Sequence, residues 1–180
     1  MPAKADRILF LCTGNAARSV MAGAALAARL PDVVVETAGT LTVDGQPMSW
    51  RTRTALESVG LDPPHHRSRQ ASPADLDRAT LVVGLAPEHV HWVRRNHVAA
   101  AARTATLKRL VRDLRTDERP LAERVAELSL ADVELEDWEE VIDPGGGEVD
   151  VFIACAEEVH ELIDGLAEVL LPEVVEGEVS

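Results

Sequence analysis

The residues in this sequence that are best suited to chemistry lie near its start, in the segment C-T-G-N-A-A-R-S from Cys12 to Ser19. Five small or polar residues separate the thiol of Cys12 from the guanidinium of Arg18. A loop of that length can curl so that its backbone N–H groups point inward and hold a tetrahedral anion. The planar fork of Arg18 suits two oxygens of the same anion, and a lysine could not replace it. The spacing therefore predicts a phosphate-like site with Cys12 as its nucleophile.

The flanking sequence indicates how this loop is positioned. An apolar run over residues 8–11 is typical of a β-strand, and the spacing of Ala, Met and Leu over residues 18–30 is helical. The loop therefore stands at a helix N-terminus, whose dipole favours both a bound anion and a thiolate. The residues expected to bind phosphate are Thr13, Gly14, Asn15, Ala16, Ala17, Arg18 and Ser19.

Beyond the loop, β-branched or apolar segments alternate with helical ones. Strands are expected over residues 8–11, 33–37, 81–85 and 104–107, and helices over residues 18–30, 50–59, 87–102, 109–130 and 149–170. A further short helix is expected with Ser72 as its N-cap and Pro73 in its first position. This alternation predicts an α/β fold: a single three-layer domain with a four-stranded parallel sheet, helices on both faces, and the phosphate-binding loop after the first strand.

Length and composition indicate one domain. The chain has 180 residues, 46% of them hydrophobic, with three Trp, two Phe and no Tyr, so its core must be built mainly from aliphatic side chains. We expect the domain to span residues 1–171, with residues 109–140 as a candidate helical insertion. The acidic residues 172–180 are expected to form a tail outside the core.

Charge and cysteine content limit the partners. A formal net charge of −13 disfavours nucleic acid and anionic lipid surfaces, since both are bound by clustered Lys and Arg. The apolar run behind Lys4 and Arg7 is too short for a secretory or membrane segment, so a cytoplasmic location is expected. Cys12 and Cys155 match no metal spacing, and a reducing cytosol disfavours a disulfide between them. We expect Cys155 to be a small buried hydrophobe.

With these motifs in place, the sequence resembles the low-molecular-weight protein tyrosine phosphatase family, which is related to the arsenate reductases. Residues 8–21 resemble the family's loop and first helix, and the segment T-A-G-T at 37–40 resembles its Ser-Ala-Gly-Thr stretch. The segment H-R-S-R-Q at 66–70 resembles its His-x-x-Arg-Gln motif, and Asp143-Pro144 resembles its late Asp-Pro. The resemblance covers most of the chain and implies catalysis without a metal or another cofactor.

The resemblance also implies roles for individual residues. Asp143 would protonate the leaving group while Cys12 forms a phosphocysteine, and would then activate water to hydrolyse it. A hydrogen-bond network that supports the loop would be carried by Asn15, Ser19, Thr37 and His66. Ser19 would in addition stabilise the thiolate. From the residues alone, an Asp before Pro and three Gly is most often only a turn.

Several positions depart from the family pattern. Ala17 stands where many members have a second, protective cysteine, and Ala16 stands where the tyrosine phosphatases have a bulky aliphatic residue and the phosphoarginine phosphatases a threonine. Residues 41–43 and 145–147 lack the aromatic side chains that enclose a tyrosine ring. Trp50 and Trp138 are the aromatic residues near these segments, and both are expected to lie in the core or on a helix face.

These observations leave three interpretations open. The first is a phosphatase that hydrolyses a phosphomonoester, on a phosphorylated protein or a small molecule, through a phosphocysteine on Cys12. The second is an arsenate reductase that uses an external small thiol, since after Leu85 there is no cysteine until Cys155 and that kind would not need a second protein cysteine. The third is a catalytically weak phosphate-binding or redox-sensing module.

Overall fold

Four parallel strands form one sheet in the order β2-β1-β3-β4. The computed structural model describes residues 4–173. Its strands are β1 (Arg7–Cys12), β2 (Val34–Gly39), β3 (Leu81–Gly84) and β4 (Thr104–Thr106). The predicted four-stranded parallel sheet is confirmed, and each strand end lies within two residues of its expected position. β1 is central, so its carboxyl end, which carries Cys12, lies between the ends of β2 and β3.

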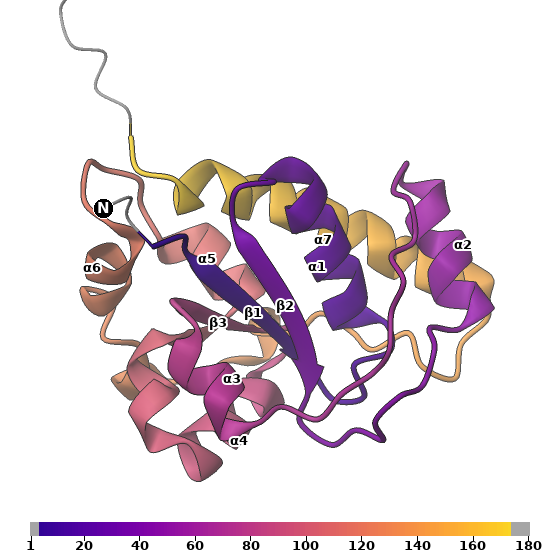
Figure 1. Cartoon of the computed structure of the whole chain (residues 1–180), viewed down its shortest axis with the longest axis horizontal. Helices are drawn as coiled ribbons and strands as arrows, with labels where there is room; N and C mark the ends of the chain where they lie inside the picture. Colours follow the sequence, from indigo (N-terminus) through magenta and orange to yellow (C-terminus); the bar gives the residue numbers. More distant parts are fainter. Residues whose placement is uncertain (1–3, 174–180) are drawn as a thin grey trace, which may run out of the picture.

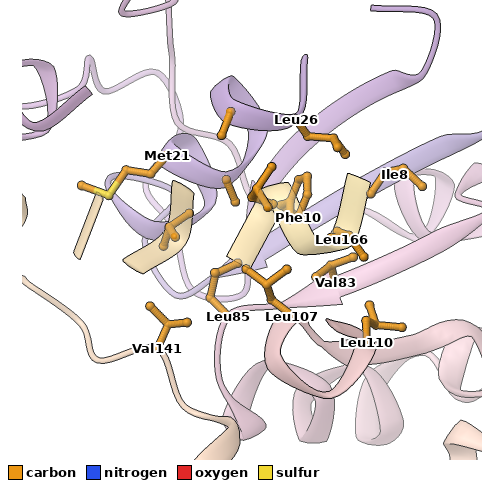
Figure 2. Close-up of a cluster of buried hydrophobic side chains, with 14 of the residues drawn as sticks. Ile8, Phe10, Met21, Leu26, Val83, Leu85, Leu107, Leu110, Val141 and Leu166 are labelled. Carbon is orange, nitrogen blue, oxygen red and sulfur yellow. The ribbon is translucent and has the colours of Figure 1, made fainter. Parts of the chain in front are cut away.

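Helices cover both faces of the sheet, as the alternation of elements predicted (Figure 1). Successive strand residues point to opposite faces, so β1 contributes to two apolar clusters. Ile8 and Phe10 pack in the cluster formed with α1 (Arg18–Arg29), α5 (Leu107–Asp113) and α7 (Val149–Leu170), part of which is drawn in Figure 2. Leu9 and Leu11 pack in the other, with α3 (Pro73–Arg78), α4 (Pro87–Asn96) and the following 3-10 turn.

The long helix α7 links the layers around the site. It contacts α1, α5 and α2 (Trp50–Ser58), and Figure 1 shows it extending past both α1 and α2. Helix α2 begins at Ser49, whose hydroxyl accepts a hydrogen bond from the N–H of Thr52 at 3.2 Å. The predicted cap at Ser72 is confirmed, and Asp75 completes a capping box with it. These caps fix the helix starts that face the first loop.

The helix expected over residues 87–102 is interrupted. Helix α4 ends at Asn96, His97 leaves the helical region with φ −144°, and η1 (Val98–Arg103) continues as a 3-10 helix. Hydrogen bonds from Arg103 to Ala99 O and from Thr104 to Ala100 O hold this tighter turn. The tighter turn buries Ala100 and delivers the chain directly into β4, which a continuous helix would not allow.

The helix expected over residues 109–130 is wrong as a single element. Helix α5 ends at Asp113, and α6 (Leu121–Ala126) begins only after Pro120. Proline lacks the N–H that a helix interior needs and restricts the residue before it, so a single helix cannot run through Pro120, which instead caps the start of α6. Short 3-10 turns, η2 (Leu130–Asp132) and η3 (Asp137–Glu139), follow. That residues 109–140 are an insertion stays a prediction, and residues 174–180 of the expected acidic tail lie outside the described residues.

Candidate active site

The loop from Cys12 to Ser19, here called the anion loop, joins the end of β1 to the start of α1. Asn15 has a left-handed backbone with φ 50°, which turns the loop back on itself. The thiol of Cys12 is only 3% exposed, and its Sγ lies 2.9 Å from the hydroxyl oxygen of Ser19. The side-chain amide of Asn15 donates to the same hydroxyl oxygen at 2.9 Å, so Ser19 can direct its own hydrogen to Cys12 Sγ.

The Asn15 side chain holds the loop from inside. Its Nδ2 donates to the hydroxyls of Ser19 at 2.9 Å and Thr37 at 3.0 Å, and its Oδ1 accepts from the N–H of Arg69 at 3.0 Å. His66 Nε2 donates to the carbonyl oxygen of Asn15 at 2.7 Å. The structure therefore brings together the four residues that the resemblance placed in a supporting network. Burial lowers the pKa of His66, so this support is a neutral imidazole.

Backbone contacts with the end of β2 set the position of the anion loop. The N–H groups of Thr40 and Leu41 donate to the carbonyl oxygens of Cys12 and Thr13 at 2.9 and 3.0 Å. This pairing requires Gly39, because a Cβ there would lie 2.6 Å from the carbonyl oxygen of Thr13. The hydroxyl of Thr42 donates to the same oxygen at 2.9 Å. These hydrogen bonds from the end of β2 and the residues after it hold the first two residues of the anion loop in place.

Arg18 connects the anion loop to the segment that carries Asp143. Its side chain is 3% exposed, and Nη1 donates to the carbonyl oxygen of Val141 at 3.0 Å. Its Nη2 lies 3.6 Å from Asp143 Oδ2 and 3.7 Å from Glu88 Oε1. Both distances exceed a good hydrogen bond, so Nη2 remains available to an incoming oxyanion.

A pocket of about 300 Å³ opens over these groups. Cys12, Arg18 and Asp143, the three expected catalytic residues, all line it, and the Asp143 side chain is 58% exposed. The N–H of Gly145 donates to Asp143 Oδ1 at 2.9 Å, which leaves the other carboxylate oxygen facing Arg18. Thr52 supports the pocket from α2, because its hydroxyl donates to the carbonyl oxygen of Ala16 at 3.1 Å.

The segment over residues 134–147, here called the acid loop, is fixed well before Asp143. The Glu139 side chain is fully buried and accepts from Arg109 Nε and Nη2, both at 2.8 Å, and from the hydroxyl of Thr106 at 2.7 Å. Val141 is then held twice, since its N–H donates to Leu85 O at 2.8 Å and its carbonyl accepts from Arg18. The acid loop is therefore clamped near its middle by the Arg109–Glu139 ion pair, and Asp143 lies two residues beyond the hydrogen-bonded Val141.

The two tryptophans lie in helical elements, Trp50 in α2 and Trp138 in η3, and neither lines the pocket. Trp50 and Trp138 are 59% and 38% exposed, so neither is a core residue, and the guanidinium of Arg112 lies 4.3 Å from the centre of the Trp138 ring. The aromatic side chain that lines the pocket is instead Phe152, from the first turn of α7. The sequence analysis did not single out Phe152, and only the approach of α7 to the anion loop gives this buried side chain an edge on the pocket.

Two further residues beside the anion loop were missed by the motifs. His89 is 1% exposed and lies in the first turn of α4, where burial and the nearby Arg18 charge lower its pKa to about 3. Its neutral ring contacts the hydroxyl of Thr13, as does the carboxylate of Glu88, each at 3.1 Å. The sequence signal was a Pro-Glu-His run directly after a strand end, a position that borders ligand sites in parallel sheets.

The second cysteine has no place in the pocket. Cys155 is a buried free thiol on α7, as expected, and burial raises its pKa to about 12. Within residues 4–173 no set of three His, Cys, Asp or Glu side chains is grouped to hold a metal ion, and no helix is long and apolar enough to cross a membrane.

Comparison with known proteins assigns the family and the fold. The sequence profile described as low molecular weight phosphotyrosine protein phosphatase matches residues 7–176. The chain belongs to this family. It is 33% identical over 168 residues to a protein-arginine-phosphatase of Geobacillus stearothermophilus, which covers 93% of this chain and 97% of that relative. It is also 36% identical over 115 residues to a low molecular weight protein-tyrosine-phosphatase of Streptomyces coelicolor, covering 59% and 67% of the two chains.

Solved structures of the family agree with this assignment. An arginine phosphatase from Geobacillus stearothermophilus superposes with a TM-score of 0.72, 32% identity and 91% of each chain covered. A low molecular weight protein tyrosine phosphatase from T. tengcongensis gives a TM-score of 0.73 at 28% identity, covering 91% of this chain and 99% of that one. The chain is thus a phosphatase with a cysteine nucleophile, and this reading is favoured over arsenate reductase and over a binding or sensing module.

Proposed function

We propose that Cys12, Arg18 and Asp143 form the catalytic set with which this chain removes phosphate from a phosphorylated protein. The backbone N–H groups of residues 13–19 and the guanidinium of Arg18 hold the three equatorial oxygens of the phosphoryl group. This arrangement counters the acidic net charge of the protein at the one place where an anion must bind.

The reaction proceeds in two steps. The Cys12 thiolate attacks phosphorus, an S–P bond forms, and the bond to the leaving group breaks while Asp143 donates a proton to the departing atom. Asp143, now a carboxylate, then takes a proton from water, which attacks the phosphocysteine and releases phosphate and the thiolate. Ser19 supports both steps by donating its hydroxyl hydrogen to the sulfur anion.

One observation carries this proposal: the buried thiol of Cys12 and the buried guanidinium of Arg18, both from the anion loop, meet the exposed carboxylate of Asp143, from a distant segment, in one pocket. Cys12 and Arg18 are almost fully buried, yet both line a pocket of about 300 Å³ whose wall also carries the exposed Asp143.

The substrate side chain we favour is phosphoarginine. The relative that matches nearly the whole chain is named a protein-arginine-phosphatase. The pocket has Ser49, Thr52 and Gly145 at its wall, and Phe152 is its one aromatic side chain among the described residues. A phosphotyrosine ring gains from flanking aromatic faces, which here are reduced to one, so phosphotyrosine would bind weakly.

The experiment that tests the proposal follows phosphate release by the wild-type protein and by Cys12→Ser. We expect wild type to hydrolyse p-nitrophenyl phosphate with a high KM and to show little preference for phosphotyrosine peptides over it. The Cys12→Ser variant should lose turnover while still binding phosphate in a calorimeter, because the loop and Arg18 are intact. Mass spectrometry of acid-quenched wild type should find the phosphate on Cys12. Unchanged turnover in Cys12→Ser would sink the thiolate mechanism.

A further inference from the structure

We infer that Glu88 is a specificity-determining residue that selects a cationic group next to the phosphate, namely the guanidinium of phosphoarginine. The inference rests on the proposed function and extends it to a residue outside the catalytic set. The observation behind it is a carboxylate placed beside the phosphate-binding guanidinium, where it would oppose an ordinary phosphate dianion.

Glu88 is held in this place by a chain of hydrogen bonds. The N–H of Ala86 donates to His89 Nδ1 at 3.0 Å, which leaves the ring proton on Nε2. His89 Nε2 therefore donates to the hydroxyl of Thr13 at 3.1 Å. With its oxygen occupied, Thr13 turns its own hydrogen to Glu88 Oε1, also at 3.1 Å. An otherwise free surface carboxylate is thus directed toward the anion loop.

Two carboxylates approach the same nitrogen of Arg18: that of Asp143, which lines the pocket, and that of Glu88, which lies in the first turn of α4 beside it. Glu88 Oε1 and Asp143 Oδ2 lie 3.7 and 3.6 Å from Arg18 Nη2, and their side chains are 65% and 58% exposed. One carboxylate is sufficient for general acid catalysis. A second negative group this near disfavours a dianion with a neutral leaving group, because like charges at short range repel each other. This electrostatic repulsion is offset when the leaving group itself carries a positive charge.

Phosphoarginine has that charge distribution. When the Cys12 thiolate attacks, the S–P bond forms and the P–N bond breaks. The electron pair goes to the bridging nitrogen, which takes the proton of Asp143, and a cationic guanidinium leaves. Glu88 can accept a hydrogen bond from an N–H of this group in the bound state and in the leaving state, whereas a phosphotyrosine ring offers it no donor.

The test compares two free phosphoamino acids, phosphoarginine and O-phosphotyrosine, together with p-nitrophenyl phosphate. In Glu88→Gln we expect kcat/KM for phosphoarginine to fall about 5- to 10-fold, a reduced value for a charged hydrogen bond at an exposed site. The two aryl phosphates should be hydrolysed as well as by wild type or up to about twofold better, since a repulsive charge is removed. Glu88→Lys should lower kcat/KM for phosphoarginine further and raise kcat/KM for the two aryl phosphates further.

Glu148→Gln is the matched control. Glu148 is an exposed glutamate at the start of α7 with Oε2 4.0 Å from Arg51 Nη2, so its loss changes the net charge equally without touching Thr13 or Arg18. It should leave all three rates unchanged. If Glu88→Gln lowers kcat/KM for all three substrates alike, or leaves all three unchanged as Glu148→Gln does, the inference is wrong. The phosphatase mechanism would still stand. If wild type hydrolyses aryl phosphates but not phosphoarginine, the inference and the proposed substrate both fail while the cysteine chemistry survives.

Discussion

The anion loop and the acid loop are both held rigidly, but by opposite kinds of interaction. The anion loop is supported by neutral groups, since Asn15, Ser19, Thr37 and His66 meet around it. The acid loop is clamped by the buried ion pair of Arg109 and Glu139.

The difference follows from what each loop must do. The anion loop has to keep its positive potential on backbone N–H groups and Arg18, and an acidic support beneath it would cancel part of that potential. The acid loop only has to deliver one carboxylate to the pocket mouth, so it can use a charged clamp four residues before Asp143. The comparison predicts distinct consequences when each support is broken.

The largest effect is expected at the tip of the acid loop. Asp143→Asn should slow hydrolysis of substrates with poor leaving groups by about 10²–10⁴-fold, the usual contribution of general acid catalysis. Activated aryl phosphates should be slowed much less, because their leaving groups depart without a proton. The measurement is a series of aryl phosphates of graded leaving-group pKa. Equal losses across the series would show that Asp143 merely shapes the loop.

The next effect concerns the clamp at Glu139. Glu139→Gln leaves the buried guanidinium of Arg109 without its charge partner, and breaking a buried pair costs about 3–5 kcal/mol of unfolding free energy. Urea denaturation measures this loss. The double variant Arg109→Met/Glu139→Leu should recover most of the stability, because neither buried charge remains.

Activity in the same double variant separates positioning from stability. If the clamp positions Asp143, the double variant stays slow on poor leaving groups while its rate on activated aryl phosphates is close to normal. Full activity of the double variant on both kinds of substrate, together with restored stability, would mean that the clamp contributes only to folding.

The smallest expected effect is a pH dependence of stability that comes from two neutral histidines beside the anion loop. His66 and His89 both have a folded-state pKa below the ordinary 6.5, that of His89 at about 3. The unfolded chain therefore binds more protons below pH 6.5, so stability is complete above this pH and is lost as the pH falls toward 3. Between pH 6.5 and 5, before most carboxylates titrate, we expect His89 to account for a loss of about 1–2 kcal/mol of unfolding free energy, and His66 to add to that loss.

Urea denaturation at pH 7, 6 and 5 checks this expectation. His89→Gln replaces one titrating ring by a neutral side chain that can still reach Thr13, and should flatten the pH dependence. His160→Gln is the control, because its ring is 38% exposed on α7. A slope unchanged by His89→Gln would show that the buried ring does not resist protonation.

Much of the site was readable from local sequence. The anion loop needs a strand end, small residues and a helix start in immediate succession, and the order of residues 8–30 sets all three. Backbone groups supply most of the anion site, so local order is nearly sufficient. The supports at Thr37 and His66 and the acid Asp143 were identified only through family resemblance, since a lone hydroxyl, His or Asp-Pro has no distinctive spacing.

Tertiary structure decided the rest, because contacts between distant segments depend on strand order and helix packing. The sequence by itself determined the four strands, the anion loop and the caps at Ser72 and Pro73. Only the fold places β3 beside β1, and this adjacency brings the Pro-Glu-His turn of α4 against Thr13. Only the packing of α7 brings Phe152 to the pocket, and only the Val141 contacts carry Asp143 to Arg18. Local patterns specify the groups that hold phosphate, and long-range packing selects the charges that surround it.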